Sequence, residues 1–118
     1  MNTRSRKNKG KRLQNKVRDL LLEQFKDLLE QDDVRSTTMG ESGEDIQLSP
    51  AARKLIPYAI ECKNQESLSI WKALEQAENN SNGYEPLLIF KRNRSKTYAV
   101  INIEKFIELI NENNKSSQ

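Results

Sequence analysis

The 118-residue sequence contains no histidine and a single cysteine, Cys62. The absence of histidine excludes His-based metal sites, histidine general bases, and Ser-His or Cys-His catalysis. One cysteine cannot form an internal disulfide, which fits a reducing cytoplasm. Any chemistry must therefore come from carboxylates, lysine, hydroxyls or a metal ion held by oxygen ligands.

Long apolar segments are also absent. Apolar residues make up 35% of the chain and charged residues 31%, and no segment approaches the roughly 18 apolar residues of a membrane span. The N-terminus has no apolar stretch typical of a secretory signal. We therefore expect a cytoplasmic protein without membrane contact, built as one domain whose small core would benefit from oligomerisation.

The net charge of +3 conceals an uneven distribution of charge. Residues 1–18 carry eight basic residues and no acidic one, whereas residues 19–33 carry six acidic residues and one lysine. Such a basic segment attracts a polyanion by neutralising phosphates and releasing counterions, although a solvated tail has the same composition. The first ten residues are polar and basic, and we expect a disordered arm over 1–10 until it meets a partner. The candidate nucleic-acid contacts here are Arg4, Arg6, Lys7, Lys9, Lys11 and Arg12.

Apolar spacing along the rest of the chain predicts alternating helices and strands. Three helices show apolar residues at steps of three and four, and they are expected at 11–31, 67–79 and from residue 103 onwards, the last with Asn102 as N-cap. A helical turn is expected at 51–54, where Ser49-Pro50 supplies an N-cap and a first-position proline. Strands are expected at 34–38, 45–48, 58–63, 87–92 and 97–103.

The resulting order, α-β-β-β-α-β-β-α, predicts an α/β fold. We expect a central mixed β-sheet of about five strands flanked by helices. The domain should cover residues 11–114, with a frayed C-terminus at 115–118.

The predicted strand "YAIECK", residues 58–63, ends in two charges. Side chains alternate between the faces of a strand, so Glu61 and Lys63 share one face while Cys62 points to the core with its apolar neighbours. If the strand that begins at Asp45 lies alongside, two carboxylates can converge. Two carboxylates with a backbone carbonyl and waters suit Mg²⁺, which is hard and prefers oxygen. Glu-X-Lys is also a common tripeptide that on most strands is a solvated ion pair.

The arrangement of Asp45 with Glu61-Cys62-Lys63 resembles the PD-(D/E)XK nuclease signature. Within that superfamily the chain looks most like the Holliday-junction resolvases of archaea and of bacterial phages. Lys9-Gly10 leads into the first helix, Ser42-Gly43 precedes the acid, and a helix and two closing strands follow the motif. The resemblance covers about residues 9–103.

The resemblance implies a restriction-endonuclease-like fold and a Mg²⁺-dependent endonuclease, with Mn²⁺ as an alternative ion. Its substrate would be DNA, in the form of a four-way junction that is cut by paired symmetric nicks. Two symmetric nicks require two active sites, which implies a homodimer. The resemblance also suggests a phage-encoded protein of a bacterial cytoplasm. The alternatives are another nicking or restriction-like PD-(D/E)XK endonuclease, or a non-catalytic DNA-binding accessory protein that keeps the fold.

Roles can be carried over residue by residue. Asp45 and Glu61 would bind the metal together with the backbone carbonyl of Cys62. Lys63 would orient or activate the attacking water. Ser42 would reach the scissile phosphate or the junction backbone.

Three positions leave alternatives open. Glu44 replaces the proline of the motif's name, so either Glu44 or Asp45 can be the ligand, and the apolar alternation that follows favours Asp45. Archaeal resolvases carry a glutamate in the first helix where this chain has Gln14, which can only hydrogen-bond and is equally well an exposed helix residue. Gln76, on the helix after the motif, can reach the site or flank the apolar stripe.

Further charged and aromatic residues have two interpretations each. Lys91, Arg92, Arg94 and Lys96 surround a β-turn and either bind phosphates or keep a sheet edge solvated. Arg53 and Lys54 are possible DNA contacts that nothing distinguishes from ordinary surface. Trp71 is a core or dimer contact in preference to a base-stacking platform.

Overall fold

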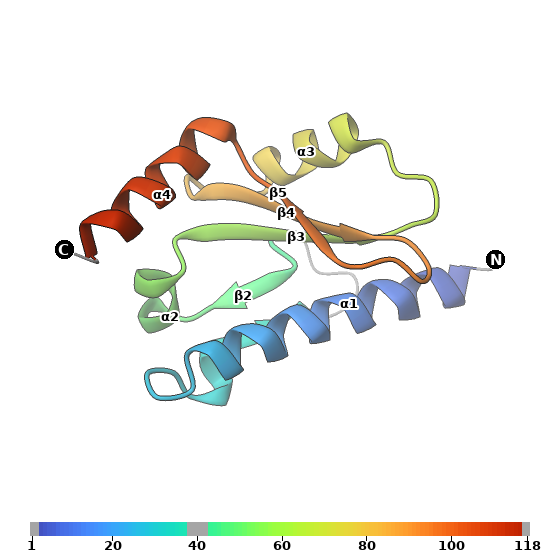
Figure 1. The fold of residues 1–118 in the computed structure, drawn as a ribbon. Helices are drawn as coiled ribbons and strands as arrows, with labels where there is room; N and C mark the ends of the chain where they lie inside the picture. Colours follow the sequence, from blue (N-terminus) through green and yellow to red (C-terminus); the bar gives the residue numbers. More distant parts are fainter. Residues whose placement is uncertain (1–2, 38–42, 117–118) are drawn as a thin grey trace.

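A computed structural model describes residues 3–37 and 43–116 of the chain and confirms the predicted α/β class. The elements in chain order are α1 (Thr3–Gln24), the 3-10 turn η1 (Gln31–Asp33), β1 (Val34–Ser36), β2 (Ile46–Leu48), α2 (Pro50–Leu55), β3 (Tyr58–Asn64), α3 (Ile70–Asn79), β4 (Glu85–Lys91), β5 (Tyr98–Val100) and α4 (Ile103–Ser116) (Figure 1). None of the helices in these ranges is long and apolar enough to cross a membrane.

The strands of the described residues form two sheets instead of the single sheet that the sequence predicts. β3 pairs in parallel with β4, β4 pairs antiparallel with β5, and β1 and β2 form a separate antiparallel pair. The two sheets meet at Asp45, whose backbone N–H donates to the Ile60 carbonyl at 3.0 Å. β2 does not continue along β3, because Ser49 and Pro50 turn the chain into α2 after three strand residues.

One face of the β3–β4–β5 sheet packs against α1 and the β1–β2 pair (Figure 1). The buried side chains of this core are Leu13, Val17, Leu29, Val34, Ile46, Ala52, Ile56, Ile60 and Cys62. Ile60 and Cys62 lie two residues apart on β3 and therefore share this face, as the alternation predicts. Cys62 is a buried core residue, and its burial raises the pKa of the thiol.

The opposite face of the sheet packs against α3 (Figure 1). Ala59 and Glu61 point to this side of β3, and Leu88, the register partner of Glu61 on β4, is fully buried beside them. α3 buries Ala73 and Ala77. Small side chains on both elements let the helix approach the sheet closely, so Glu61 is enclosed in an apolar layer.

α1 differs from the expected helix at both ends. It begins at Thr3, so the part of the predicted disordered arm that the structure describes, 3–10, is helical. Lysine and arginine favour helix, and Lys9 is buried in it, which explains the earlier start. α1 ends at Gln24 and not at Gln31, because a turn follows it.

Both predicted helix caps are confirmed. The Ser49 hydroxyl accepts from the Ala52 N–H at the start of α2, and Asn102 Oδ1 accepts from the Glu104 N–H at the start of α4. The later elements differ in length: α3 begins three residues after the expected Ser67, β5 is shorter than predicted, and α4 extends into the segment expected to fray.

Candidate functional site

Two carboxylates meet beside the second half of β3. Asp45 directly precedes β2, and its Oδ2 accepts a hydrogen bond from the Cys62 backbone N–H at 2.7 Å. The Glu61 carboxyl group lies near enough to Asp45 for the latter to raise its pKa. Glu61 Oε1 also accepts from Asn80 Nδ2 at 2.7 Å, at the C-terminal end of α3. The structure therefore brings Asp45 and Glu61 together, although 16 positions of sequence separate them.

Glu61 is only 2% exposed. Burial, the hydrogen bond to Asp45 and the charge of Asp45 raise its pKa from 4.5 to about 8, against the lowering effects of Asn80 and Lys63. Without a cation Glu61 therefore favours its protonated form at neutral pH. A site that retains a proton in this way binds a cation with release of that proton.

The backbone around Cys62 offers a third oxygen atom that could bind a cation. The Cys62 N–H and the Ile60 carbonyl both point to the edge of β3 where Asp45 lies. The N–H and C=O of one strand residue face the same edge, so the Cys62 carbonyl also faces Asp45. No group of three His, Cys, Asp or Glu side chains converges in residues 3–37 and 43–116. The donor set is thus two carboxylates and one carbonyl, which fits an ion such as Mg²⁺ that keeps several waters.

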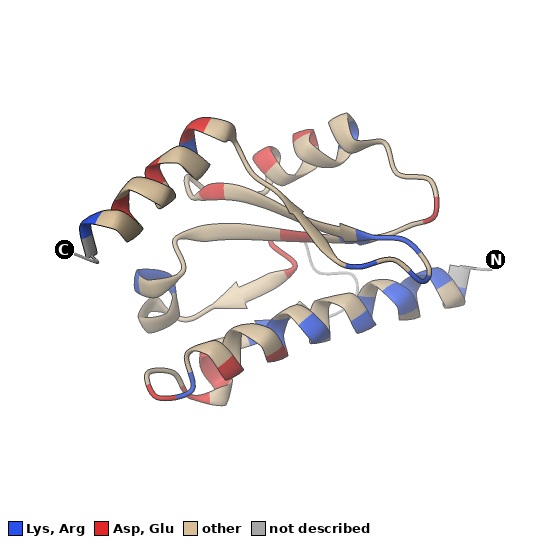
Figure 2. Cartoon of the chain, in the orientation of Figure 1, with Lys and Arg blue, Asp and Glu red and all other residues tan. Residues whose placement is uncertain are grey.

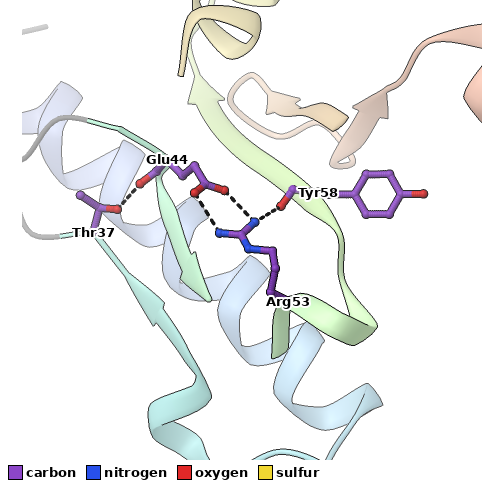
Figure 3. A network of polar contacts seen from close by, with 4 residues as sticks. All are labelled: Thr37, Glu44, Arg53 and Tyr58. Carbon is purple, nitrogen blue, oxygen red and sulfur yellow. Dashed lines mark hydrogen bonds and ion pairs between the residues drawn. The ribbon is translucent and has the colours of Figure 1, made fainter. Parts of the chain in front are cut away.

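Glu44, the other candidate acid, forms an ion pair beside the site (Figure 3). Arg53 binds the Glu44 carboxylate with both terminal nitrogens, at 2.9 Å each, and Nη1 also donates to the Tyr58 carbonyl at 2.7 Å. The two side chains are 15% and 11% exposed. Because this carboxylate is already paired, Asp45 is the acid that faces β3.

Arg53 also contacts an aromatic ring. Its guanidinium lies 4.1 Å from the centroid of the Tyr84 ring, a cation–π distance. The Thr37 hydroxyl donates to the Glu44 carbonyl, which ties the same segment to the end of β1 (Figure 3). Arg53, one of the possible DNA contacts, thus has internal contacts in the segment next to Asp45.

The remaining predicted site residues lie at different distances from this pair. Lys63 is half-buried on the face of β3 that carries Glu61. Gln14 lies on the packed side of α1, and its Oε1 is buried without a hydrogen-bond partner among residues 3–37 and 43–116. Gln76 is exposed on α3, one turn before Asn80. Ser42 lies outside the described residues.

Basic side chains from two distant segments gather at one end of the molecule. Figure 2 shows the Lys and Arg residues of the N-terminal half of α1 beside those of the β4–β5 connection. The two segments are joined by Lys16, whose Nζ donates to Thr97 Oγ1 at 3.2 Å. The exposed members of this basic surface on the candidate list are Arg4, Arg6, Lys7, Arg12, Arg92, Arg94 and Lys96.

Two of the candidate basic residues are engaged within the domain. Lys9 is only 6% exposed. Lys11 Nζ donates to the Thr37 carbonyl at 2.9 Å and joins α1 to the end of β1.

Trp71 is 82% exposed, so it is not a core residue. Its interpretation as a dimer contact stays a prediction.

Comparison with known proteins identifies a family for the chain. A family model described as "Phage putative PDDEXK endonuclease" matches residues 5–118. The chain belongs to this family. No curated protein and no solved structure matches the chain.

Membership of the phage PDDEXK endonuclease family confirms the nuclease resemblance seen in Asp45 and the "ECK" segment. The candidate site also contains a residue that the sequence did not identify. Asn80 lies in a segment that is predicted as a loop, and an asparagine at a helix end is ordinarily a cap. Its position four residues after Gln76, on the same side of α3, is the signal that could have identified it.

Proposed function

We propose that this chain is a Mg²⁺-dependent, structure-selective DNA endonuclease that resolves four-way junctions by paired symmetric nicks, acting as a homodimer. The observation that carries the proposal is the meeting of Asp45 and Glu61 beside Lys63, in a chain of an endonuclease family. Mn²⁺ is the alternative ion. Phosphodiester hydrolysis by a water molecule needs this set of groups and no histidine.

Asp45, Glu61 and the Cys62 carbonyl would hold the cation. When bound, the cation would neutralise charge that develops on the scissile phosphate. Asn80 holds Glu61 Oε1 in place from the opposite side. A hydrogen bond of this kind fixes the orientation of a ligating carboxylate.

Lys63 and Gln14 would serve the attacking water. Lys63 shares the face of β3 with Glu61, and its ammonium would orient the water and offset phosphate charge. The orphaned Gln14 Oε1 supports a role for α1, since a buried acceptor without a partner is rare. Ser42 and Gln76 remain candidate contacts of the scissile phosphate and of the site.

The basic surface would bind the phosphates of a DNA arm. Its residues come from α1 and from the β4–β5 connection, held together by the contact of Lys16 with Thr97. Such contacts read the position of phosphates and not the base edges. This suits a substrate that is recognised by its branched shape.

The test uses a labelled four-way junction and a matched linear duplex. Each substrate is incubated with the wild-type protein in Mg²⁺, in Mn²⁺ and in EDTA. The variants Asp45→Asn and Glu61→Gln are tested in the same way, and Glu44→Gln is the matched control. We expect paired symmetric nicks in the junction alone, lost in EDTA and in the first two variants. Glu44→Gln should still cut when it is folded, because its carboxylate pairs with Arg53.

Other outcomes identify the alternatives. Equal cutting of the linear duplex would indicate a nicking or restriction-like endonuclease with the same site. Tight junction binding without cleavage in any metal would indicate a DNA-binding accessory protein and would refute the catalytic role of the two acids.

A further inference from the structure

α4 presents its polar side to the domain and its apolar side to solvent. The Lys105 side chain is only 32% exposed and pairs with Glu108, whereas Ile103 is 66% and Ile107 55% exposed. The side of the helix that carries Lys105 therefore faces the body of the protein, where its charge acts on Tyr58 at the start of β3. At 3.6 residues per turn this side lies opposite Ile103 and Ile107. α4 makes few contacts with the rest of the chain (Figure 1). A helix in this orientation leaves its hydrophobic stripe without a partner in the described chain.

The exposed stripe is large for a small protein. The apolar residues exposed on α4 are Ile103, Phe106, Ile107, Leu109 and Ile110. Half-exposed large apolar side chains of roughly 200 Å² each expose on the order of 500 Å² together. That is more than half of the roughly 800 Å² that each partner contributes to an interface of standard size.

The charges around the stripe argue against a nucleic acid or a membrane as the occupant. α4 carries Glu104, Glu108 and Glu112 against Lys105 and Lys115. DNA requires a basic surface, and a helix that lies on a membrane has a polar face rich in Lys and Arg. A protein surface is the remaining class of occupant.

The stripe is complementary to itself. When two copies of α4 are placed antiparallel with a two-fold axis between Phe106 and Ile107, Phe106 of one copy faces Ile107 of the other. The same operation places Ile103 opposite Ile110. In a two-fold interface each contact occurs twice, because residue i of one copy contacts residue j of the other and the reverse also holds. All four positions of the pairing are apolar, so neither copy buries a charge there.

The position of α4 also suits two copies that both bind DNA. α4 lies near Tyr58, where β3 begins, whereas the basic β4–β5 connection begins at Lys91, where β4 ends (Figure 2). β3 and β4 are parallel, so the two features lie at opposite ends of the sheet. Pairing through α4 therefore separates the two basic surfaces and leaves both sites accessible.

We propose that the apolar face of α4 binds the same face of a second copy, forming a two-fold dimer with antiparallel α4 helices. The proposal names the surface through which the homodimer of the proposed function would form. It rests on the proposed function only in the need for two active sites.

The first test compares the masses of the full-length protein and two variants by sedimentation equilibrium at micromolar concentration. Ile107→Glu places a charge in the centre of the stripe, at an exposed position that does not disturb the core. Trp71→Glu is the comparison variant, since Trp71 is 82% exposed on α3 and is the rival dimer contact that the sequence suggests. We expect a dimer for the wild type and for Trp71→Glu. Ile107→Glu should keep its circular dichroism spectrum and weaken dimerisation at least 100-fold.

The second test fixes the geometry by cross-linking. The double variant Ile103→Cys with Ile110→Cys should form a covalent dimer on mild oxidation, whereas Ile103→Cys alone should not, because Ile103 faces Ile110 and not itself. Cys62 is buried and should remain a thiol. A monomeric wild type, a dimeric Ile107→Glu, or dissociation by Trp71→Glu would overturn the proposal. A dimer that passes both tests but cuts no DNA would refute the proposed function and leave this surface standing.

Discussion

Replacing Asp45 by asparagine should stabilise the metal-free protein. Asp45 Oδ2 accepts the Cys62 N–H, and an asparagine oxygen can accept the same bond. Its amide nitrogen can donate to the Glu61 carboxylate, which Asp45 repels when both are ionised. The substitution therefore removes an unfavourable pair of like charges and keeps the shape of the site.

The gain in stability from Asp45→Asn should depend on pH, because the ionisation of Glu61 determines whether the two side chains repel each other. Its pKa of about 8 exceeds the ordinary 4.5, so between these values the folded protein binds a proton that the unfolded chain does not. Stability without metal should therefore fall as pH rises from about 4.5 to 8. Burial is the largest cause of the shift, and the hydrogen bond and charge of Asp45 add to it. The repulsion between two carboxylates in contact is on the order of 1 kcal/mol. Asp45→Asn should thus raise the unfolding temperature by about 3–8 °C at pH 9.

The assay is thermal unfolding followed by circular dichroism in EDTA at about pH 6 and about pH 9, on either side of the titration. Asp27→Asn removes an exposed carboxylate and is the matched control. Mg²⁺ at the higher pH should raise the unfolding temperature of the wild type and of Asp27→Asn, but not of Asp45→Asn. A loss of stability in Asp45→Asn at pH 9, or an equal gain at both pH values, would refute the reasoning.

Three further predictions concern the surroundings of the site. Arg53→Met should lower the free energy of unfolding by about 3 kcal/mol, because it leaves the Glu44 carboxylate buried and unpaired. Chemical denaturation should show a smaller loss of stability in the double variant Arg53→Met with Glu44→Gln. Equal losses in the single and double variants would contradict the pairing. Asn80→Ala should raise the Mg²⁺ concentration for half-maximal cleavage about 10-fold, whereas Asn79→Ala, an exposed neighbour, should leave it unchanged. Arg94→Ala should reduce the slope of log affinity for DNA against log salt by about 1; an unchanged slope would remove Arg94 from the DNA contacts.

Much of the fold follows from local patterns. The alternation in residues 58–63 gives both the strand and the two faces of β3, and the Ser49-Pro50 pair gives the start of α2. These signals depend on neighbouring residues and therefore survive in any tertiary context. The helical start at Thr3 was missed because a basic, polar composition is shared by solvated helices and disordered arms.

The choice between Glu44 and Asp45 was not decidable from the sequence alone. It depends on Arg53, whose side chain reaches back nine residues to pair with Glu44. Asn80 was missed for the same reason, since its contact with Glu61 spans 19 residues. The apolar stripe of α4 was recognised, but periodicity does not tell which way a helix is turned, and this one is turned outward.

The junction of the two sheets at Asp45 has a consequence for motion. β2 and β3 are held there by the backbone bond from Asp45 to Ile60 and by the bond from Cys62 to the Asp45 side chain, and not by a continuous ladder. The candidate metal ligands thus lie on both sides of a seam, and parting of the seam is a local opening that does not require global unfolding. The Cys62 amide should exchange its hydrogen at the rate of that opening, and a cation bound across the seam should slow this exchange more than that of the β3–β4 amides.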